Sequence, residues 1–177
     1  MTRSAMRMMT WAGVTLGVVL CAQQGVHGQQ RPLPEFQVAR IDGTAVSGRT
    51  ISAQSKWLLV YVAPGSVPSE RLVEALQQWQ SPEMLRRTVV VVDGRSAQAA
   101  GWVRRSFGDP AQTGWSVYLD PQGQARQALA ITGAPTLIGI KAAAEDATTA
   151  PTVAWTIAGV LNDPNTVESP VRTWTER

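Results

Sequence analysis

The stretch "LLVYVAPGSVPSERLVEAL", residues Leu58 to Leu76, joins an apolar run to an amphipathic helical pattern through a short turn. The apolar run, Trp57 to Val62, is typical of a central strand that is buried on both faces. The helical pattern extends from about Pro68 to Gln80 and places its apolar residues on one face: Leu72, Val73, Leu76 and Trp79. The segment therefore predicts a strand, a turn and a helix in direct succession.

A second apolar run, Thr88 to Val92, follows this helix and ends at Asp93-Gly94. Two buried strands joined by a helix form a right-handed unit with parallel strands. The same pattern then recurs, with a helix near Ser96 to Phe107, a strand at Trp115 to Leu119, a turn at Asp120 to Gly123 and a short helix through Leu129. The repetition predicts an α/β domain built on a partly parallel sheet.

Antiparallel strands are expected at both ends of this pattern. After an extended lead-in, Phe36 to Ile41 alternates apolar and polar residues and meets Asp42-Gly43, a hairpin-turn signal. Beyond Gly133-Ala-Pro135, two further strands, Thr136 to Ile140 and Thr152 to Ala158, predict a hairpin linked by a mobile loop, Lys141 to Pro151. A last amphipathic helix, about Thr166 to Thr175, is expected to close the sheet.

The N-terminal segment has the features of a secretory signal peptide. Arg3 and Arg7 precede the apolar run Trp11 to Ala22, and small residues follow. This run is shorter than the roughly 20 residues that span a bilayer, so no stable membrane insertion is expected after cleavage. Lipid attachment at Cys21 is disfavoured because Leu20 precedes it. We expect residues 1–28 to be removed, 29–35 to form the lead-in, 36–177 to form the domain, and the protein to be secreted into a bacterial periplasm.

The charge and residue counts exclude several functions. Loss of Arg3 and Arg7 reduces the net charge from +3 to +1, so the high isoelectric point is no argument for nucleic acid or membrane partners. The single cysteine, Cys21, and the single histidine, His27, both lie in the predicted signal peptide. A mature chain without thiol or imidazole cannot perform thiol exchange or Ser-His catalysis, and it has no cysteine or histidine to ligate a metal. We expect no metal and no cofactor.

The order of motifs resembles that of the thioredoxin-like superfamily, in its redoxin or secreted thiol-disulfide oxidoreductase-like branch. "YVAPGSVPS", Tyr61 to Ser69, is similar to the strand-to-helix segment that carries Cys-x-x-Cys in that family, and "ITGAPTL", Ile131 to Leu137, is similar to its Val-x-Gly-x-Pro-Thr motif. The resemblance implies a three-layer α/β/α sandwich with a mixed central sheet, formed of parallel strands and an antiparallel C-terminal hairpin. It also implies a cis peptide bond before Pro135.

The resemblance fails at the residues that perform the family's chemistry. Ser66 and Ser69 stand where the family has its two cysteines, so Ser66-Val67-Pro68-Ser69 is a vestigial active site. Two serines cannot form the mixed disulfide through which thiol exchange proceeds. Capping of the helix by at least one serine hydroxyl is the simplest interpretation, because serine is favoured at helix N-caps.

A serine nucleophile would need a nearby base, and only Lys56 and Lys141 are available. Lys56 lies at the far end of its strand from Ser66, roughly 20 Å away at about 3.3 Å per residue. Lys141 lies at the far end of the strand that follows Pro135. A Ser-Lys hydrolase is therefore not expected.

A polypeptide-binding role remains. In the family, the segment around the proline presents backbone groups to an extended peptide. The predicted groove comprises Gly65, Ser66, Ala134, Pro135, Thr136 and Asp93. Asp93 also fits a structural interpretation, because aspartate before glycine is common in turns. The partner would be an envelope protein or an extended peptide. Two alternatives stay open: an oxidoreductase of the redoxin family by descent, and a structural subunit of an envelope complex.

Overall fold

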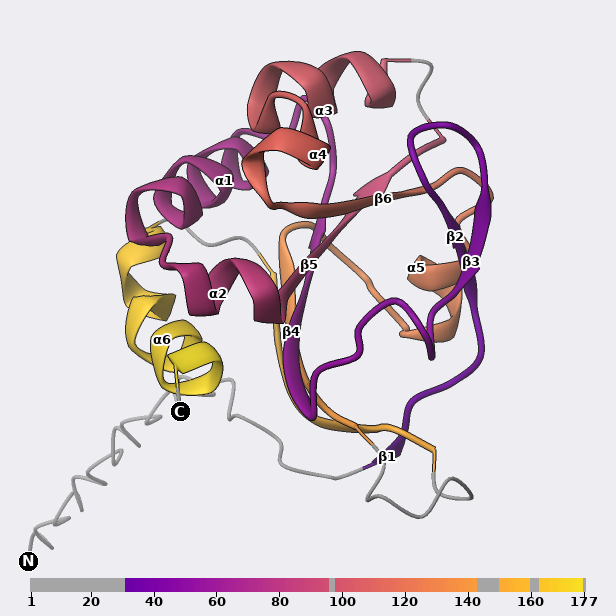
Figure 1. Cartoon of the computed structure of the whole chain (residues 1–177), viewed down its shortest axis with the longest axis vertical. Helices are drawn as coiled ribbons and strands as arrows, with labels where there is room; N and C mark the ends of the chain where they lie inside the picture. Colours follow the sequence, from indigo (N-terminus) through magenta and orange to yellow (C-terminus); the bar gives the residue numbers. More distant parts are fainter. Residues whose placement is uncertain (1–30, 96–97, 143–149, 160–162, 177) are drawn as a thin grey trace, which may run out of the picture.

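The computed structural model describes residues 31–95, 98–142, 150–159 and 163–176 of the chain (Figure 1). The predicted signal peptide, with Cys21 and His27, lies outside these residues, as does most of the predicted link Lys141 to Pro151. Across the described residues, we find no helix with the length and apolar character needed to cross a bilayer.

The described residues form one mixed sheet of eight strands in the order β1-β8-β7-β4-β5-β6-β2-β3. Strands β4, β5 and β6 are parallel, and every other neighbouring pair is antiparallel. The strands are β1 (Arg31–Pro32), β2 (Gln37–Ala39), β3 (Ala45–Ser47), β4 (Lys56–Val62), β5 (Thr88–Asp93), β6 (Ser116–Asp120), β7 (Thr136–Lys141) and β8 (Thr152–Ala158). The predicted parallel unit and the predicted C-terminal strand pair are both confirmed.

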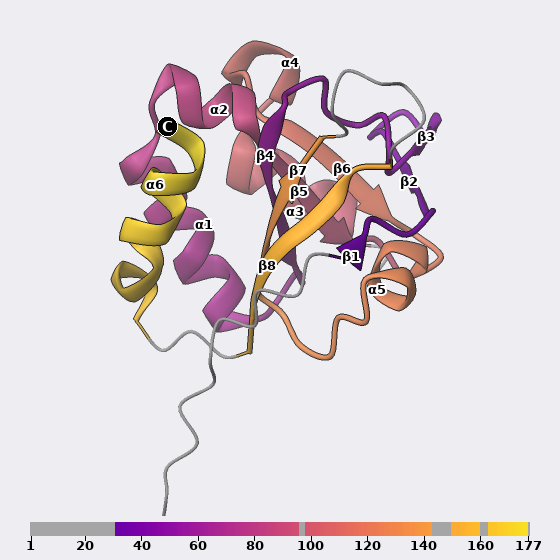
Figure 2. The same cartoon turned by 90° about the horizontal axis from the view of Figure 1, so that it is seen from below.

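Helices cover both faces of this sheet, so the predicted three-layer α/β/α sandwich with a mixed central sheet is confirmed. Figure 2 shows α1 and α6 on one side of the sheet and α5 on the other. The helices are α1 (Val67–Trp79), α2 (Pro82–Arg87), α3 (Ala99–Phe107), α4 (Pro110–Thr113), α5 (Gln124–Ala128), the 3-10 helix η1 (Pro164–Val167) and α6 (Glu168–Glu176).

Strand β4 is central because it contributes to two separate cores. Leu58, Val60 and Val62 pack with α1, α3 and α6, whereas Trp57, Leu59 and Tyr61 pack with α5 and the N-terminal segment. Successive side chains of a strand point to opposite faces, so an unbroken apolar run is what a strand with two buried faces requires. Strand β5, whose six residues are all buried, follows the same rule.

Three elements were not predicted. Helix α2 begins at Ser81, whose hydroxyl accepts a hydrogen bond from the backbone N–H of Met84 at 3.1 Å. Helix α4 is a single turn after Asp109. The predicted lead-in is extended, but its residues Arg31 and Pro32 also pair with β8 as the edge strand β1.

Candidate functional site

The turn that carries the vestigial motif is held by its own backbone. The N–H of Ser66 donates to the carbonyl of Ala63 at 3.2 Å, and Gly65 has a φ of +76°. Proline followed by a residue with positive φ is the pattern of a type II turn, which explains Pro64-Gly65. The turn brings the chain from the carboxyl end of β4 directly to the first residue of α1.

The two serines of the motif have different environments, and neither caps α1 through its side chain. Ser66 occupies the N-cap position, but its hydroxyl makes no capping hydrogen bond. Ser69 is fully buried, and its hydroxyl accepts a hydrogen bond from the backbone N–H of Ala63 at 3.2 Å. The predicted side-chain capping is therefore wrong, because the hydroxyl of Ser69 instead joins the helix to the end of β4.

The exposed part of the vestigial motif is apolar. Val67 is 55% exposed and is the one large hydrophobic side chain of the described residues that lies open to solvent. It stands between Ser66, which is half-buried, and Pro68, in the first turn of α1. The most exposed residue of the motif is thus Val67 rather than a serine.

The start of β7 lies at the same edge of the sheet as the turn. Tyr61 and Thr136 are partners in the antiparallel pair β4-β7. Residues 62–63, which follow Tyr61, and residues 134–135, which precede Thr136, therefore lie beyond this pair at the same end of the two strands. The Ala134-Pro135 bond is cis, as the resemblance implied. Ala134 is half-buried, Pro135 is buried, and the hydroxyl of Thr136 donates to the carbonyl of Gly133 at 2.7 Å. Pro135 and Thr136 therefore present little surface to solvent.

The two lysines lie at the opposite end of these strands. Lys56 and Lys141 are partners at the far end of the pair β4-β7, and the ammonium group of Lys56 lies 4.5 Å from the centre of the Trp174 ring. This placement confirms the prediction that neither lysine can serve Ser66 as a base.

Asp93, at the carboxyl end of β5, holds two arginines that the sequence analysis did not select. The Nε and Nη2 atoms of Arg95 donate to its two carboxylate oxygens at 2.9 and 2.6 Å, and Nη1 of Arg126 lies 3.4 Å from Oδ2. The side-chain hydrogen bonds from Arg95 keep the pKa of Asp93 below its ordinary value. The backbone N–H of Arg95 also donates to Asp93 at 3.3 Å, so the expected turn contact is present as well.

A second carboxylate, Asp120, lies beside this cluster and is fully buried. It accepts hydrogen bonds from the backbone N–H groups of Ala125 and Arg126 at 3.2 and 3.0 Å, and from the hydroxyl of Tyr61 at 3.3 Å. Burial, followed by the charge of Asp120, raises the pKa of Tyr61 far above its usual value. Asp120 therefore ties the start of α5 to the carboxyl ends of β4 and β6.

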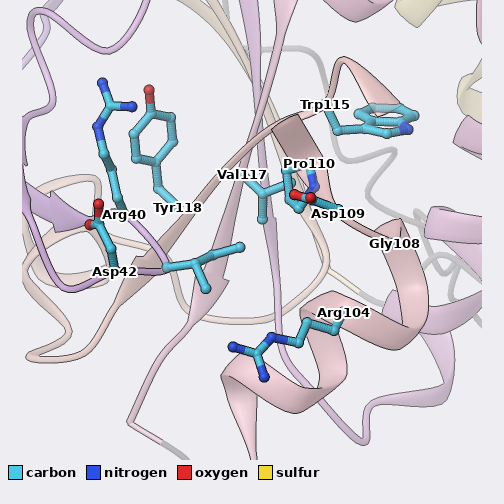
Figure 3. Close-up of a pocket in the computed structure, with 10 residues that line it drawn as sticks. Arg40, Asp42, Arg104, Gly108, Asp109, Pro110, Trp115, Val117 and Tyr118 are labelled. Carbon is cyan, nitrogen blue, oxygen red and sulfur yellow. The ribbon is translucent and has the colours of Figure 1, made fainter. Parts of the chain in front are cut away.

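A cavity of about 880 Å³ lies elsewhere, between the β2-β3 turn, β6 and the α3-α4 corner. Figure 3 shows Arg40 and Tyr118 side by side at one end, Trp115 at the other, and Arg104 reaching in from α3. Two aspartates, Asp42 and Asp109, also line it and balance the arginines. The cavity contains none of the predicted site residues, and its mixed charges select no ligand class.

The described residues contain no group of three or more His, Cys, Asp or Glu side chains placed to hold a metal ion.

Comparisons with known proteins relate the chain to others through its structure. No protein-family model matches the sequence, and no curated protein matches it. Among solved structures, one assigned as the thiol:disulfide interchange protein DsbE from Chlorobium tepidum matches with a TM-score of 0.59 and 18% identity, over 83% of this chain and 97% of the other. The thioredoxin domain of a thiol-disulfide oxidoreductase from Bacteroides vulgatus matches with a TM-score of 0.54 and 16% identity, over 80% and 96% of the two chains.

A secreted disulfide oxidoreductase from Mycobacterium tuberculosis, homologous to DsbE of E. coli, gives a TM-score of 0.54 and 12% identity, over 78% of this chain and 95% of the other. At these identities the likeness concerns architecture and not chemistry. Together with the sheet order and the turn geometry, it shows that the chain has the thioredoxin-like fold.

Proposed function

We propose that this protein is a secreted, thioredoxin-like module of the bacterial periplasm that binds an extended polypeptide and performs no dithiol chemistry. One observation carries the proposal: the strand-turn-helix scaffold is intact, it contains no cysteine, and Val67 is exposed at the start of its helix. The resemblance places the two thiols of the family at Ser66 and Ser69. Val67 gives the end of the sheet beyond β4 an apolar contact for a partner.

The location at the carboxyl ends of β4 and β5 supports binding. Open α/β sheets tend to bind ligands outside the carboxyl ends of their strands. Gly65 and Val67 are exposed there, and Ser66 and Ala134 are half-buried. The similar structures include that of a secreted oxidoreductase, which favours an extracytoplasmic location for this chain.

The first test measures the excluded chemistry. Purified protein lacking residues 1–28 is assayed for insulin reduction and for peroxide turnover, with the Ser66→Cys/Ser69→Cys variant as the matched comparison. We expect the unsubstituted protein to show only background rates. Rates above background would overturn the proposal in favour of an oxidoreductase of the redoxin family.

The second test separates groove binding from attachment through another face. Envelope proteins retained on the immobilised protein are compared with those retained on Ser66→Trp and Ala134→Trp variants. Ala45→Trp, an exposed position on β3, is the matched control. Loss of a partner with the two groove variants but not with the control supports the groove. Equal retention on all variants would instead favour a structural subunit that assembles through a different surface.

A further inference from the structure

A cavity of about 410 Å³ lies between Arg95, helix α5 and the segment Ala130 to Thr132 that follows it, and its lining residues are rich in hydrogen-bond donors. Its polar lining comprises the guanidinium groups of Arg95 and Arg126, the amides of Gln122 and Gln127 and the hydroxyl of Thr132. No carboxylate is among its lining residues. The 880 Å³ cavity of Figure 3 includes Asp42 and Asp109, and a third cavity, beside α1 and α3, includes Glu70 and Glu74. Of these three cavities on the described part of the chain, the cavity of about 410 Å³ thus favours an anion, because arginines line it and carboxylates do not.

Asp93 orders the two arginines without occupying all their donors. Arg95 uses its Nε and Nη2 atoms on Asp93, so within the described residues the edge formed by Nη1 and Nη2 retains N–H groups for a ligand. Arg126 contributes only Nη1 to Asp93 among the described residues. A carboxylate binds best to a guanidinium edge that offers two parallel N–H groups. A positioned edge of that kind is present on Arg95.

The charges are layered from the interior to the surface. The side chains of Arg95 and Arg126 are 53% and 33% exposed, whereas that of Asp93 is 11% exposed. Asp120 is fully buried below them and is satisfied by backbone N–H groups and Tyr61. Asp93 and Asp120 therefore hold the two arginines from the buried side. The guanidinium groups lie nearer to the solvent, where a ligand can reach them.

Residues that line the cavity are neighbours in sequence of residues in the proposed polypeptide site. Ile131 and Thr132 form part of its wall and lead directly to Gly133 and Ala134. On its other side, Arg95 follows β5, the strand that pairs with β4 as far as Val62 and Val92. The segment before β7, the α1 turn and Arg95 therefore follow one another at the same end of the neighbouring strands β7, β4 and β5.

We infer that Arg95 and Arg126 form a subsite for an acidic side chain, glutamate or aspartate, of the extended polypeptide that the protein binds. The inference rests on the proposed function and names its partner chemistry. The partner segment then carries an aliphatic residue to contact Val67 and an acidic residue to meet the two arginines.

The test uses two terminally blocked peptide libraries, each with degenerate positions around one fixed residue, glutamate in the first and glutamine in the second. Peptides retained on the immobilised protein are quantified by mass spectrometry. We expect about tenfold greater retention of the glutamate library at low salt, with the preference falling as salt rises. The Arg95→Gln/Arg126→Gln variant should lose the preference. Arg105→Gln, an exposed arginine on α3, should retain it.

A second measurement is independent of peptide binding. The Nε–Hε signals of Arg95 and Arg126 are followed by NMR during titration with N-acetyl-glutamate amide. If neither library is retained but these signals shift, the subsite stands and the polypeptide proposal fails. If both libraries are retained equally, the polypeptide proposal stands and the acidic subsite is overturned. Absence of both the preference and the shifts overturns the inference as well.

Discussion

The buried hydroxyl of Ser69 accepts a hydrogen bond from the backbone N–H of Ala63 at 3.2 Å, across the turn that joins β4 to α1. Ser66, three residues earlier, makes no capping hydrogen bond with its hydroxyl. The hydroxyl of Ser69 therefore has a structural contact, whereas that of Ser66 makes no capping contact.

This difference predicts unequal costs of removing the two hydroxyls. Ser69→Ala leaves the N–H of Ala63 without its acceptor and should lower the free energy of unfolding by about 1–2 kcal/mol. Ser66→Ala removes no hydrogen bond seen in the structure and should change it by less than about 0.5 kcal/mol. Urea unfolding of the two variants tests the prediction. Equal effects would contradict the assignment of the Ser69 contact.

Replacing both serines by cysteine should restore a disulfide. The first position lies at the N-terminus of α1 and the second follows one turn later, which is the arrangement that the resemblance implies for exchange-active cysteines. Ser66→Cys/Ser69→Cys should form a reducible intramolecular disulfide and gain some insulin-reducing activity. Thiol titration and mass spectrometry measure the bond, with each single variant as the control. A folded double variant that stays reduced would show that the geometry has diverged.

Loss of the Asp120 carboxylate should lower the free energy of unfolding more than loss of the Tyr61 hydroxyl that donates to it. Tyr61→Phe removes one hydrogen bond to a carboxylate and should cost about 1–2 kcal/mol of unfolding free energy. Asp120→Ala leaves the N–H groups of Ala125 and Arg126 and the Tyr61 hydroxyl without their acceptor, and should cost about 3 kcal/mol or more. Thermal and denaturant unfolding provide the values. An Asp120→Ala cost below that of Tyr61→Phe would contradict the described network.

The lowered pKa of Asp93 predicts a pH-dependent share of stability. A carboxylate whose pKa is lower in the folded state than in the unfolded state stabilises the fold above the unfolded-state value, here about 3.8. That contribution is lost as the pH falls through the lower, folded-state pKa. The difference in unfolding free energy between the unsubstituted protein and Asp93→Asn should thus be constant from pH 7 to 5 and shrink below about pH 4. An equal difference in unfolding free energy at pH 7 and at pH 3 would contradict a lowered pKa of Asp93 in the folded protein.

Ala130 ends the α5 segment with a φ of +54°, in the left-handed region. Glycine adopts this conformation without the steric penalty that a Cβ atom brings. Ala130→Gly should raise the free energy of unfolding by about 0.5–1 kcal/mol. The matched control is Ala128→Gly, inside α5, which should lower it by a similar amount. A destabilised Ala130→Gly protein would contradict the conformation.

Much of the fold could be predicted because its central strands carry an unambiguous pattern. The runs Trp57 to Val62 and Val89 to Val92 are continuously hydrophobic, and the intervening helix is amphipathic. Helix α2 was missed because its six residues are too few for a helical period, although Ser81-Pro82 is a helix-start signal.

The candidate site was harder to predict because its contacts join distant parts of the chain. Arg95 and Arg126 meet only through Asp93, and no local pattern connects a residue after β5 with one on α5. Asp93 itself was identified, but its turn signal gave no indication of side-chain partners. The capping expectation for Ser66 and Ser69 failed because helix-start statistics describe neighbours in sequence, whereas Ser69 bonds back to Ala63.

The two edges of the sheet bear on how the protein behaves in a crowded compartment. One edge ends in β1, which has two residues and includes Pro32, and the other ends in β3, which has three. Proline lacks the N–H group that a further strand would pair with, and strands this short offer few free backbone groups. Within the described residues, both edges therefore offer few backbone groups to which a strand of another copy could add.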